Sequence, residues 1–212
     1  MSIITDWISA LANCAVAGGL IFTARQVKIS RDELKQARAD MEGDHERSRR
    51  ERAIELFSNW TKNLNQRAAA SRKFAEKLNQ DQSRALLQQD SFEVDEKYKG
   101  LLAAALSGTA PESKNGKIKL TEEHSSEIRW QIVMYLNNLE AVLSAWVHNV
   151  ADKKILEEQY RFLISPNEGH YILEQFRIVA GGAHTYPAIY EFVRDSKKKS
   201  LTTAKDSIHS PS

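Results

Sequence analysis

Apolar residues first gather in the longest uncharged run of the chain, residues 7–24, WISALANCAVAGGLIFTA. With the residues just before it, this run supplies the about 20 residues that a helix needs to cross the hydrocarbon core of a membrane. Its hydropathy is moderate, because Ser9, Asn13 and Gly18 oppose insertion. The pattern predicts a single transmembrane anchor over residues 1–25.

Two other interpretations of the uncharged run stay open. A processed signal peptide normally begins with basic residues, which are missing here. A helix buried in the core of a soluble protein is the second alternative. An anchor fits the run better than either, because an uncharged run near this length is typical of a membrane span.

The charges on either side of the run predict its orientation. No Lys or Arg precedes it, whereas Arg25, Lys28, Arg31 and Lys35 follow it closely. Because positive charge favours the cytoplasmic side, we expect the N-terminus outside and the rest of the chain in the cytoplasm. The expected location is the inner membrane of a bacterium, with the lipid bilayer as one partner.

Small residues recur at steps of four within the predicted anchor, which would let a second helix approach closely. The candidate self-association residues are Ala10, Cys14, Ala15, Gly18 and Gly19. A homo-oligomer formed through the span is one interpretation. The other is that short side chains are simply common in weakly apolar spans.

Residues 26–43 are highly charged and carry a thin apolar seam at Val27, Leu34, Ala37 and Met41, with spacings of seven, three and four. The pattern predicts a helical stalk continuous with the anchor and interrupted at Gly43, because glycine costs about 1 kcal/mol in a helix. The seam is shorter than the three or four heptads that establish a coiled coil. We expect a solvated stalk, with a parallel dimerising stalk as the alternative.

Helical periodicity resumes after the stalk. Residues 44–80 repeat apolar side chains on one face and predict the first core-facing helix. Residues 81–89 predict a short helix or a bend, and Ser91 is expected to cap a helix that runs to residue 106. Residues 107–120 contain an Asn-Gly turn signal and predict a surface loop with a small hairpin, suited to contact with a partner.

The strongest helical pattern follows Thr121, which is expected to cap it. Its apolar stripe consists of Ile128, Ile132, Tyr135, Leu139, Val142, Trp146 and Val150. Further helix starts are predicted at Asp152, at the capping box of residues 165–168 and at Pro187, with Gly181-Gly182 as a stop between the last two.

The predicted fold class is therefore all-α. The anchor and stalk lead into a helical domain over residues 44–196, a cytoplasmic bundle of about five to six helices. The buried face of its last helix is expected to include Ile189, Tyr190, Phe192 and Val193. Residues 197–212 are polar, lack apolar periodicity and predict a disordered tail.

Charge and cysteine usage narrow the classes of function. The chain has 30 basic and 28 acidic residues, interspersed along its length, for a net charge of +2. Nucleic-acid binders usually show a basic field, so no nucleic acid is expected as a partner. Cys14 is the lone cysteine, which excludes an intrachain disulfide and fits a reducing compartment.

The sequence has no glycine-rich phosphate loop, HExxH, CxxC or nucleophile elbow, so we expect no enzyme, no catalytic residue, no metal and no cofactor. The remaining candidates form a polar seam of the bundle: Arg129, Asn137, Asn138, Glu140, His148, Arg161 and Arg177. Glu140 is expected to pair with an arginine of this seam, because buried polar groups need partners. The alternative is a metal-dependent hydrolase or nuclease that uses Glu140 and His148.

Several short segments carry a resemblance: Asn137-Asn138-Leu139-Glu140, Trp146-Val147-His148 with Asp152, Phe176-Arg177, and Pro187-x-x-Tyr190-x-Phe192. With them the chain resembles a family of uncharacterised bacterial and prophage membrane proteins, a domain of unknown function with a Leu-Asn-x-Leu-Glu segment. The resemblance implies one N-terminal span, a charged helix and a helical domain. It brings no established activity and no catalytic residue.

The sequence thus predicts a membrane-tethered cytoplasmic helical protein that binds an unidentified protein partner. The resemblance adds a role as a prophage accessory factor in superinfection exclusion or phage defence. Two alternatives remain, the hydrolase or nuclease above and a self-associating effector that perturbs the membrane.

Overall fold

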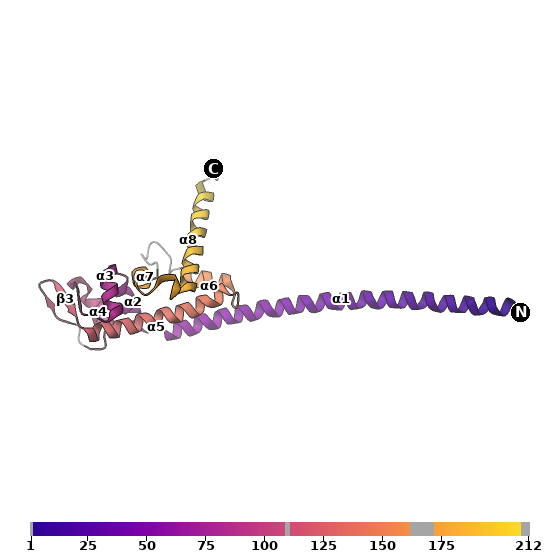
Figure 1. Ribbon diagram of the computed structural model, residues 1–212, viewed down its shortest axis with the longest axis horizontal. Coiled ribbons are helices and arrows are strands. Elements are labelled where there is room, and N and C mark those ends of the chain that lie inside the picture. Colours follow the sequence, from indigo (N-terminus) through magenta and orange to yellow (C-terminus); the bar gives the residue numbers. More distant parts are fainter. Residues whose placement is uncertain (1, 109–110, 162–171, 209–212) are drawn as a thin grey trace. The chain divides into compact units, whose positions relative to one another are not determined.

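A computed structural model describes the backbone of residues 2–108, 111–161 and 172–208 (Figure 1). Side chains are described for residues 22–23, 25–108, 111–161 and 172–199. The described residues are mostly helical, as the sequence predicts, with one small sheet. The chain divides into two compact units, Met1–Ser48 and Arg49–Ser212, which are described separately below.

Helix α1, Ser2–Asn63, contributes all of the described backbone of the first unit and the beginning of the second. It runs through Gly43 without a break, so the predicted interruption there is wrong. One glycine costs about 1 kcal/mol, which the surrounding Ala, Arg, Glu and Gln residues outweigh. Every side chain from residue 25 to residue 52 is exposed, and Ala53 is the first that is buried.

Within the described residues, no helix has both the length and the hydropathy that crossing a membrane requires. The side chains of residues 1–21, which make up most of the predicted anchor, lie outside the described residues. The same holds for the candidate self-association residues Ala10, Cys14, Ala15, Gly18 and Gly19.

The second unit is built on α5, Glu122–Val147, whose buried stripe follows the predicted pattern from Ile128 to Trp146. Thr121 caps it as predicted, in a reciprocal capping box with His124. Val150 was expected to continue the stripe, but it is 55% exposed because the helix ends at Val147.

The first core-facing helix predicted over residues 44–80 is helical and its apolar face is largely buried, but its extent is wrong, because the chain turns after α1 ends at Asn63. Asn65 then caps α2, Gln66–Ala75, by accepting a hydrogen bond at Oδ1 from Ala68 N at 2.8 Å. An amide side chain satisfies an N–H group that has no partner within the helix, so it favours a new helix start here. The short helix predicted after residue 80 is confirmed as α3, Gln80–Gln88.

The helix predicted from Ser91 is also wrong at its start. Residues Phe92–Asp95 form strand β1, which pairs antiparallel with β3, Lys117–Leu120; β3 in turn pairs with β2, Ser113–Lys114. Val94 and Ile118 are opposite each other and buried. A strand buries alternate residues, and the pairing that decides the conformation comes from a segment distant in sequence.

The predicted hairpin is confirmed between β2 and β3, where Asn115 and Gly116 both adopt positive φ, 52° and 76°. After β1 the chain continues through a single 3₁₀ turn, η1, Glu96–Tyr98, into α4, Lys99–Ala105. The helical half of the Ser91 prediction is therefore present, with a later start.

Two further helix starts are placed as predicted. Asp152 caps α6, Lys153–Tyr160, through hydrogen bonds from Lys154 N and Ile155 N. The capping box of residues 165–168 lies outside the described residues. After it come α7, Glu174–Val179, and the 3₁₀ turn η4, Gly182–His184, with Gly181 at φ 105° between them.

The last helix, α8, spans Pro187–Ile208 and begins at the predicted proline. Ile189, Phe192 and Val193 are buried as expected, whereas Tyr190 is 48% exposed. The helix continues past residue 197, where the sequence predicts a disordered tail. Lys199 Nζ reaches Glu157 Oε2 and Asp195 Oδ2, each at 2.9 Å, and these ion pairs favour the added turns.

Alanine substitutions at two glycines, one in the hairpin turn and one in α4, test the turn geometry. Gly116 has φ +76°, so Gly116→Ala should lower the free energy of unfolding by about 1 to 2 kcal/mol. Gly100 lies in α4 with no atom near its added methyl, so Gly100→Ala should raise that free energy by up to about 1 kcal/mol. Urea unfolding of both variants gives the two signs; equal effects would contradict the turn geometry.

Candidate functional site

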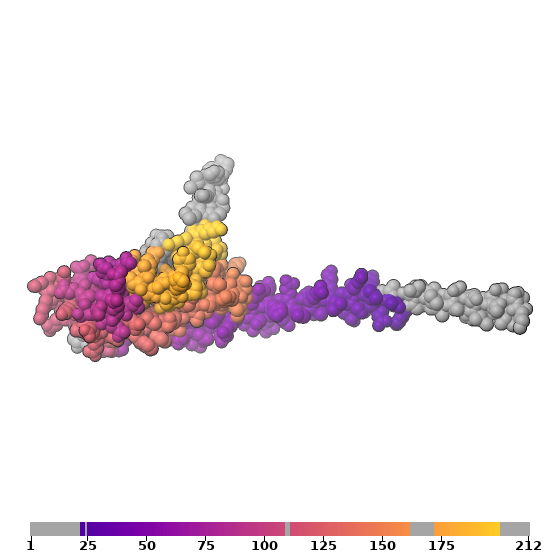
Figure 2. Space-filling view, viewed as in Figure 1, coloured from indigo at the N-terminus to yellow at the C-terminus, as the bar shows by residue number. Residues whose placement is uncertain are grey.

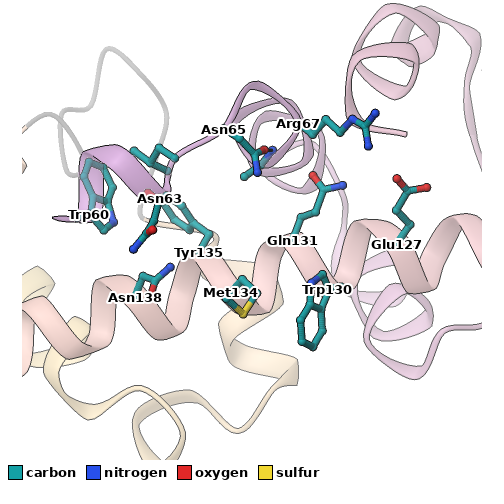
Figure 3. A pocket seen from close by; sticks show the side chains of 12 residues that line it. Trp60, Asn63, Asn65, Arg67, Glu127, Trp130, Gln131, Met134, Tyr135 and Asn138 are labelled. Carbon is teal, nitrogen blue, oxygen red and sulfur yellow. Dashed lines mark hydrogen bonds between the residues drawn. The ribbon is translucent and has the colours of Figure 1, made fainter. Parts of the chain in front are cut away.

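A groove of about 460 Å³ lies in the second unit, between the end of α1, the start of α2 and one side of α5 (Figure 3). The residues that line it come from these three helices: Trp60, Asn63, Leu64, Asn65, Arg67, Ala68, Glu127, Trp130, Gln131, Met134, Tyr135 and Asn138. The break in the predicted 44–80 helix creates this groove, because the turn at Leu64 and Asn65 sets α2 beside α5.

Aromatic rings form the buried side of the groove. Trp60 is 6% exposed and packs edge-on against Tyr160, with ring centroids 5.0 Å apart. Phe57 also meets Tyr160 edge-on at 6.0 Å, and Tyr135 lies 6.1 Å from Trp60. Ring pairs at these distances contribute about 0.5–1.5 kcal/mol each beyond their burial, so these contacts stabilise the wall of the groove.

Tyr135 combines deep burial with an unused hydroxyl. It is 4% exposed, and among the described residues no group hydrogen-bonds its Oη. Burial raises the pKa of the Tyr135 phenol above its ordinary value, so the hydroxyl stays neutral and protonated at physiological pH. A buried hydroxyl without a partner costs about 1–3 kcal/mol of stability.

An ion pair supports Tyr135 from α2. The Arg72 guanidinium lies 5.9 Å from the centre of the Tyr135 ring, in the range of a cation–π contact. Arg72 Nη1 also reaches Glu76 Oε1 at 2.7 Å. Burial raises the pKa of Glu76 by more than the neighbouring arginine lowers it. The pair therefore fixes the ring while its charges remain mostly away from water.

The open side of the groove carries exposed apolar and amide groups. Trp130 is 64% exposed and Met134 is 42% exposed, one helical turn apart on α5. Large apolar side chains on one exposed face are typical of contact surfaces. The Asn63 and Asn138 carboxamides face each other at the Trp60 end of the groove (Figure 3). A carboxamide can both donate to and accept from a peptide group.

Gln131 shows that not every amide in the groove is available. Its Nε2 donates to Ala105 O at 3.0 Å, and its Oε1 accepts from Ser71 Oγ at 2.9 Å. It therefore ties α5 to α2 and α4. Among the described residues no such bond involves the side chains of Asn63 or Asn138, so the groove's free amides lie at its Trp60 end.

Glu140, the centre of the predicted polar seam, has a structural role that the sequence did not indicate. Its Oε1 accepts a hydrogen bond from Ala188 N at 2.7 Å, and its Oε2 accepts one from Ile189 N at 3.0 Å. Both carboxylate oxygens therefore cap α8, while the Arg177 charge remains near enough to interact with Glu140. Free N–H groups and the helix dipole make the start of a helix a favourable place for a carboxylate.

The other seam residues do not converge on one site. Arg177 is 6% exposed and its Nε donates to Ile172 O at 2.6 Å, while burial lowers its pKa despite the nearby charges of Glu174 and Glu140. The remaining members differ in setting: Asn137, His148 and Arg161 are exposed, and Arg129 is half-buried. Asn138 is the one member of the seam that lines the groove.

No group of three or more His, Cys, Asp or Glu residues in the described part of the chain could hold a metal ion. Both oxygens of Glu140 are already engaged by backbone N–H groups, and His148 stands at the C-terminal end of α5, two turns away. These two residues therefore do not share a site of the kind that a hydrolase with one metal ion would use.

Comparison with known proteins gives no family, curated relative or solved structure that matches this chain. The resemblance described for the sequence therefore stays a prediction, and the groove is interpreted from its own chemistry.

Glu140 and His148 provide a direct test of the capping role. Glu140→Ala removes the acceptor for two backbone N–H groups, so the free energy of unfolding should fall by about 1–3 kcal/mol. His148→Ala, at an exposed position, should change it by less than about 0.5 kcal/mol. Thermal unfolding with amide exchange at Ala188 and Ile189 checks both. Unchanged protection of these amides in Glu140→Ala would contradict the cap.

Proposed function

We propose that this chain is a membrane-tethered interaction protein that binds a segment of a partner protein in the groove between α1, α2 and α5. The observation that carries the proposal is the open side of the groove, where Trp130 and Met134 lie one helical turn apart on α5 and are 64% and 42% exposed. An apolar side chain of the partner can pack on these two residues.

The chemistry of the groove favours a peptide over a small charged ligand. The charged residues that line it are Arg67 and Glu127, one of each sign, so no net field selects an anion or a cation. Asn63 and Asn138 offer donors and acceptors in the pattern of a peptide group. Trp130 adds the large flat surface that recurs at protein interfaces.

The tether follows from the sequence. The uncharged run of residues 7–24 is long enough to form a span, and the basic residues that follow it favour a cytoplasmic domain. A role in superinfection exclusion or phage defence follows from the family resemblance. The partner in that case is a protein met at the inner face of the membrane.

Asn138→Ala separates binding from stability. Its carboxamide lines the groove, is half-buried and has no hydrogen bond among the described residues. The free energy of unfolding should therefore change by less than about 1 kcal/mol, while partner capture should fall about threefold or more. Capture is measured in cells by a photoreactive residue at Met134 of the full chain. Asn137→Ala, an exposed position of α5 outside the lining of the groove, should leave capture unchanged.

Trp130→Ala completes this test. The side chain is largely exposed, so the fold should keep its stability while the Met134 adduct is lost. A photoreactive residue at Glu158, exposed on α6, is the control for random collisions. Adducts from Met134 no stronger than those from Glu158, or adducts that persist in Trp130→Ala, would contradict the groove as the binding surface.

Membrane fractionation tests the tether independently. The full chain should sediment with membranes and resist extraction by alkaline carbonate, and deletion of residues 1–25 should release the domain to the soluble fraction. Recovery of the full chain in the soluble fraction would contradict the tether and leave the groove proposal standing.

A further inference from the structure

The exposed part of α1 carries an apolar seam in strict register. Val27, Leu34 and Met41 are spaced seven residues apart, and their side chains are 48%, 60% and 60% exposed. All side chains described between residues 25 and 52 are exposed, so none of these three apolar groups is buried. In Figure 2 the same segment of α1 is drawn in indigo and purple.

A lone solvated helix of this kind gains nothing from its apolar seam. Most helix stability in proteins comes from packing an apolar face against another element. A repeat of seven residues is the period at which a helix keeps one seam against a second helix. With Val27, Leu34 and Met41 at position a, the d positions are Ser30, Ala37 and Asp44.

The charged residues on either side of the seam indicate which helix can pair with it. In this frame the g positions are Gln26, Glu33 and Asp40, and the e positions are Arg31, Arg38 and His45. One flank is therefore acidic or neutral, and the other is basic at Arg31 and Arg38 and neutral at His45. Interhelical pairs between g and e side chains set partner choice and orientation in coiled coils.

We propose that residues 26–47 form a parallel, in-register coiled coil with a second copy of this chain. In a parallel pair, each g residue meets the e residue of the following heptad on the other copy. Glu33 then faces Arg38 of the second copy, Asp40 faces His45, and Gln26 faces Arg31, in both directions across the two-fold axis. Each of these pairs is attractive or neutral.

The antiparallel arrangement of the same helices is disfavoured by its charges. It sets e against e and g against g, so Arg31, Arg38 and His45 meet one another, as do Glu33 and Asp40. Such like-charge contacts are repulsive. Asp40 accepts a hydrogen bond from the neutral side chain of Gln36 on the same helix, at 3.0 Å. This bond leaves the negative charge of Asp40 available for the parallel pair.

The d positions make this a weak coiled coil. Ser30 and Ala37 bury little apolar surface, and Asp44 faces Asp44 of the second copy, which is repulsive. The association therefore depends on the a positions and on the attractive flanking charges. Weak association is strengthened when both copies are held at one surface, because a shared surface raises their effective concentration. Two copies would then present two copies of the groove to the same partner.

Cysteine cross-linking of the full chain in membranes tests the pairing. In a Cys14→Ala background, Val27→Cys places a thiol at the seam, and Asp32→Cys places one on the opposite, f position as the matched control. Under mild oxidant, homotypic cross-linking of the Val27→Cys variant should exceed that of Asp32→Cys by at least about tenfold. Equal yields would overturn the seam as the interface.

Cysteines at Val27 and Met41 distinguish a parallel pair from an antiparallel one. Homotypic cross-links of Val27→Cys and of Met41→Cys support the parallel register. Cross-links that form only when these two variants are mixed would show an antiparallel pair and overturn the proposal.

Charge reversal tests the pairs themselves, with the Val27→Cys cross-link as readout. Glu33→Arg alone and Arg38→Glu alone should each lower the yield about threefold or more, since each sets like charges together. Mixing the two variants should restore heterotypic cross-linking, because each then supplies the charge that the other lacks. Failure of the mixture to exceed either single variant would overturn the pairing.

Discussion

The buried stripe of α5 is the constraint on which the second unit depends. α2 and α8 both pack on this helix, and Thr121, which caps it, follows strand β3 directly. Trp146 meets Phe192 of α8 edge-on at 5.3 Å and donates from Nε1 to Glu157 of α6 at 3.0 Å. Loss of the α5 stripe would therefore remove the shared partner of the other elements.

Glu140 extends this constraint from packing to hydrogen bonding. A carboxylate on α5 satisfies two N–H groups at the start of α8, so the position of one helix fixes the beginning of the other. In the sequence, Glu140 stands beside two asparagines and looks like part of a polar site. Its partners are backbone groups 48 and 49 residues away, and backbone N–H groups carry no signal in a sequence.

Local signals in the sequence predict much of the fold. Caps at Thr121 and Asp152, the proline at the start of α8 and the Asn-Gly turn each depend on neighbouring residues, and the structure confirms all of them. Strand β1 was missed because its conformation depends on pairing with β3, far along the chain. The early end of α1 was missed for a related reason: the turn at Leu64 gains its stability from α2 packing on α4 and α5.

Most of the candidate groove could not be predicted from the sequence. Trp60 and Tyr135 look like ordinary core residues, and only the structure shows that the Tyr135 hydroxyl has no partner among the described residues. Trp130 gave the one usable signal, a large aromatic off the apolar stripe of α5, which predicts exposure. Asn138 was selected within the polar seam, but in the groove it faces Asn63 of α1, which the predicted seam does not include.

Native-state hydrogen exchange tests most directly whether α5 is the element on which the others depend. We expect amides of residues 128–143 to exchange slowest, at the free energy of global unfolding, because their opening requires α2 and α8 to separate from them. Faster exchange across residues 128–143 than across α2 and α8 would show that those helices hold together without α5, which would rule out α5 as the shared support.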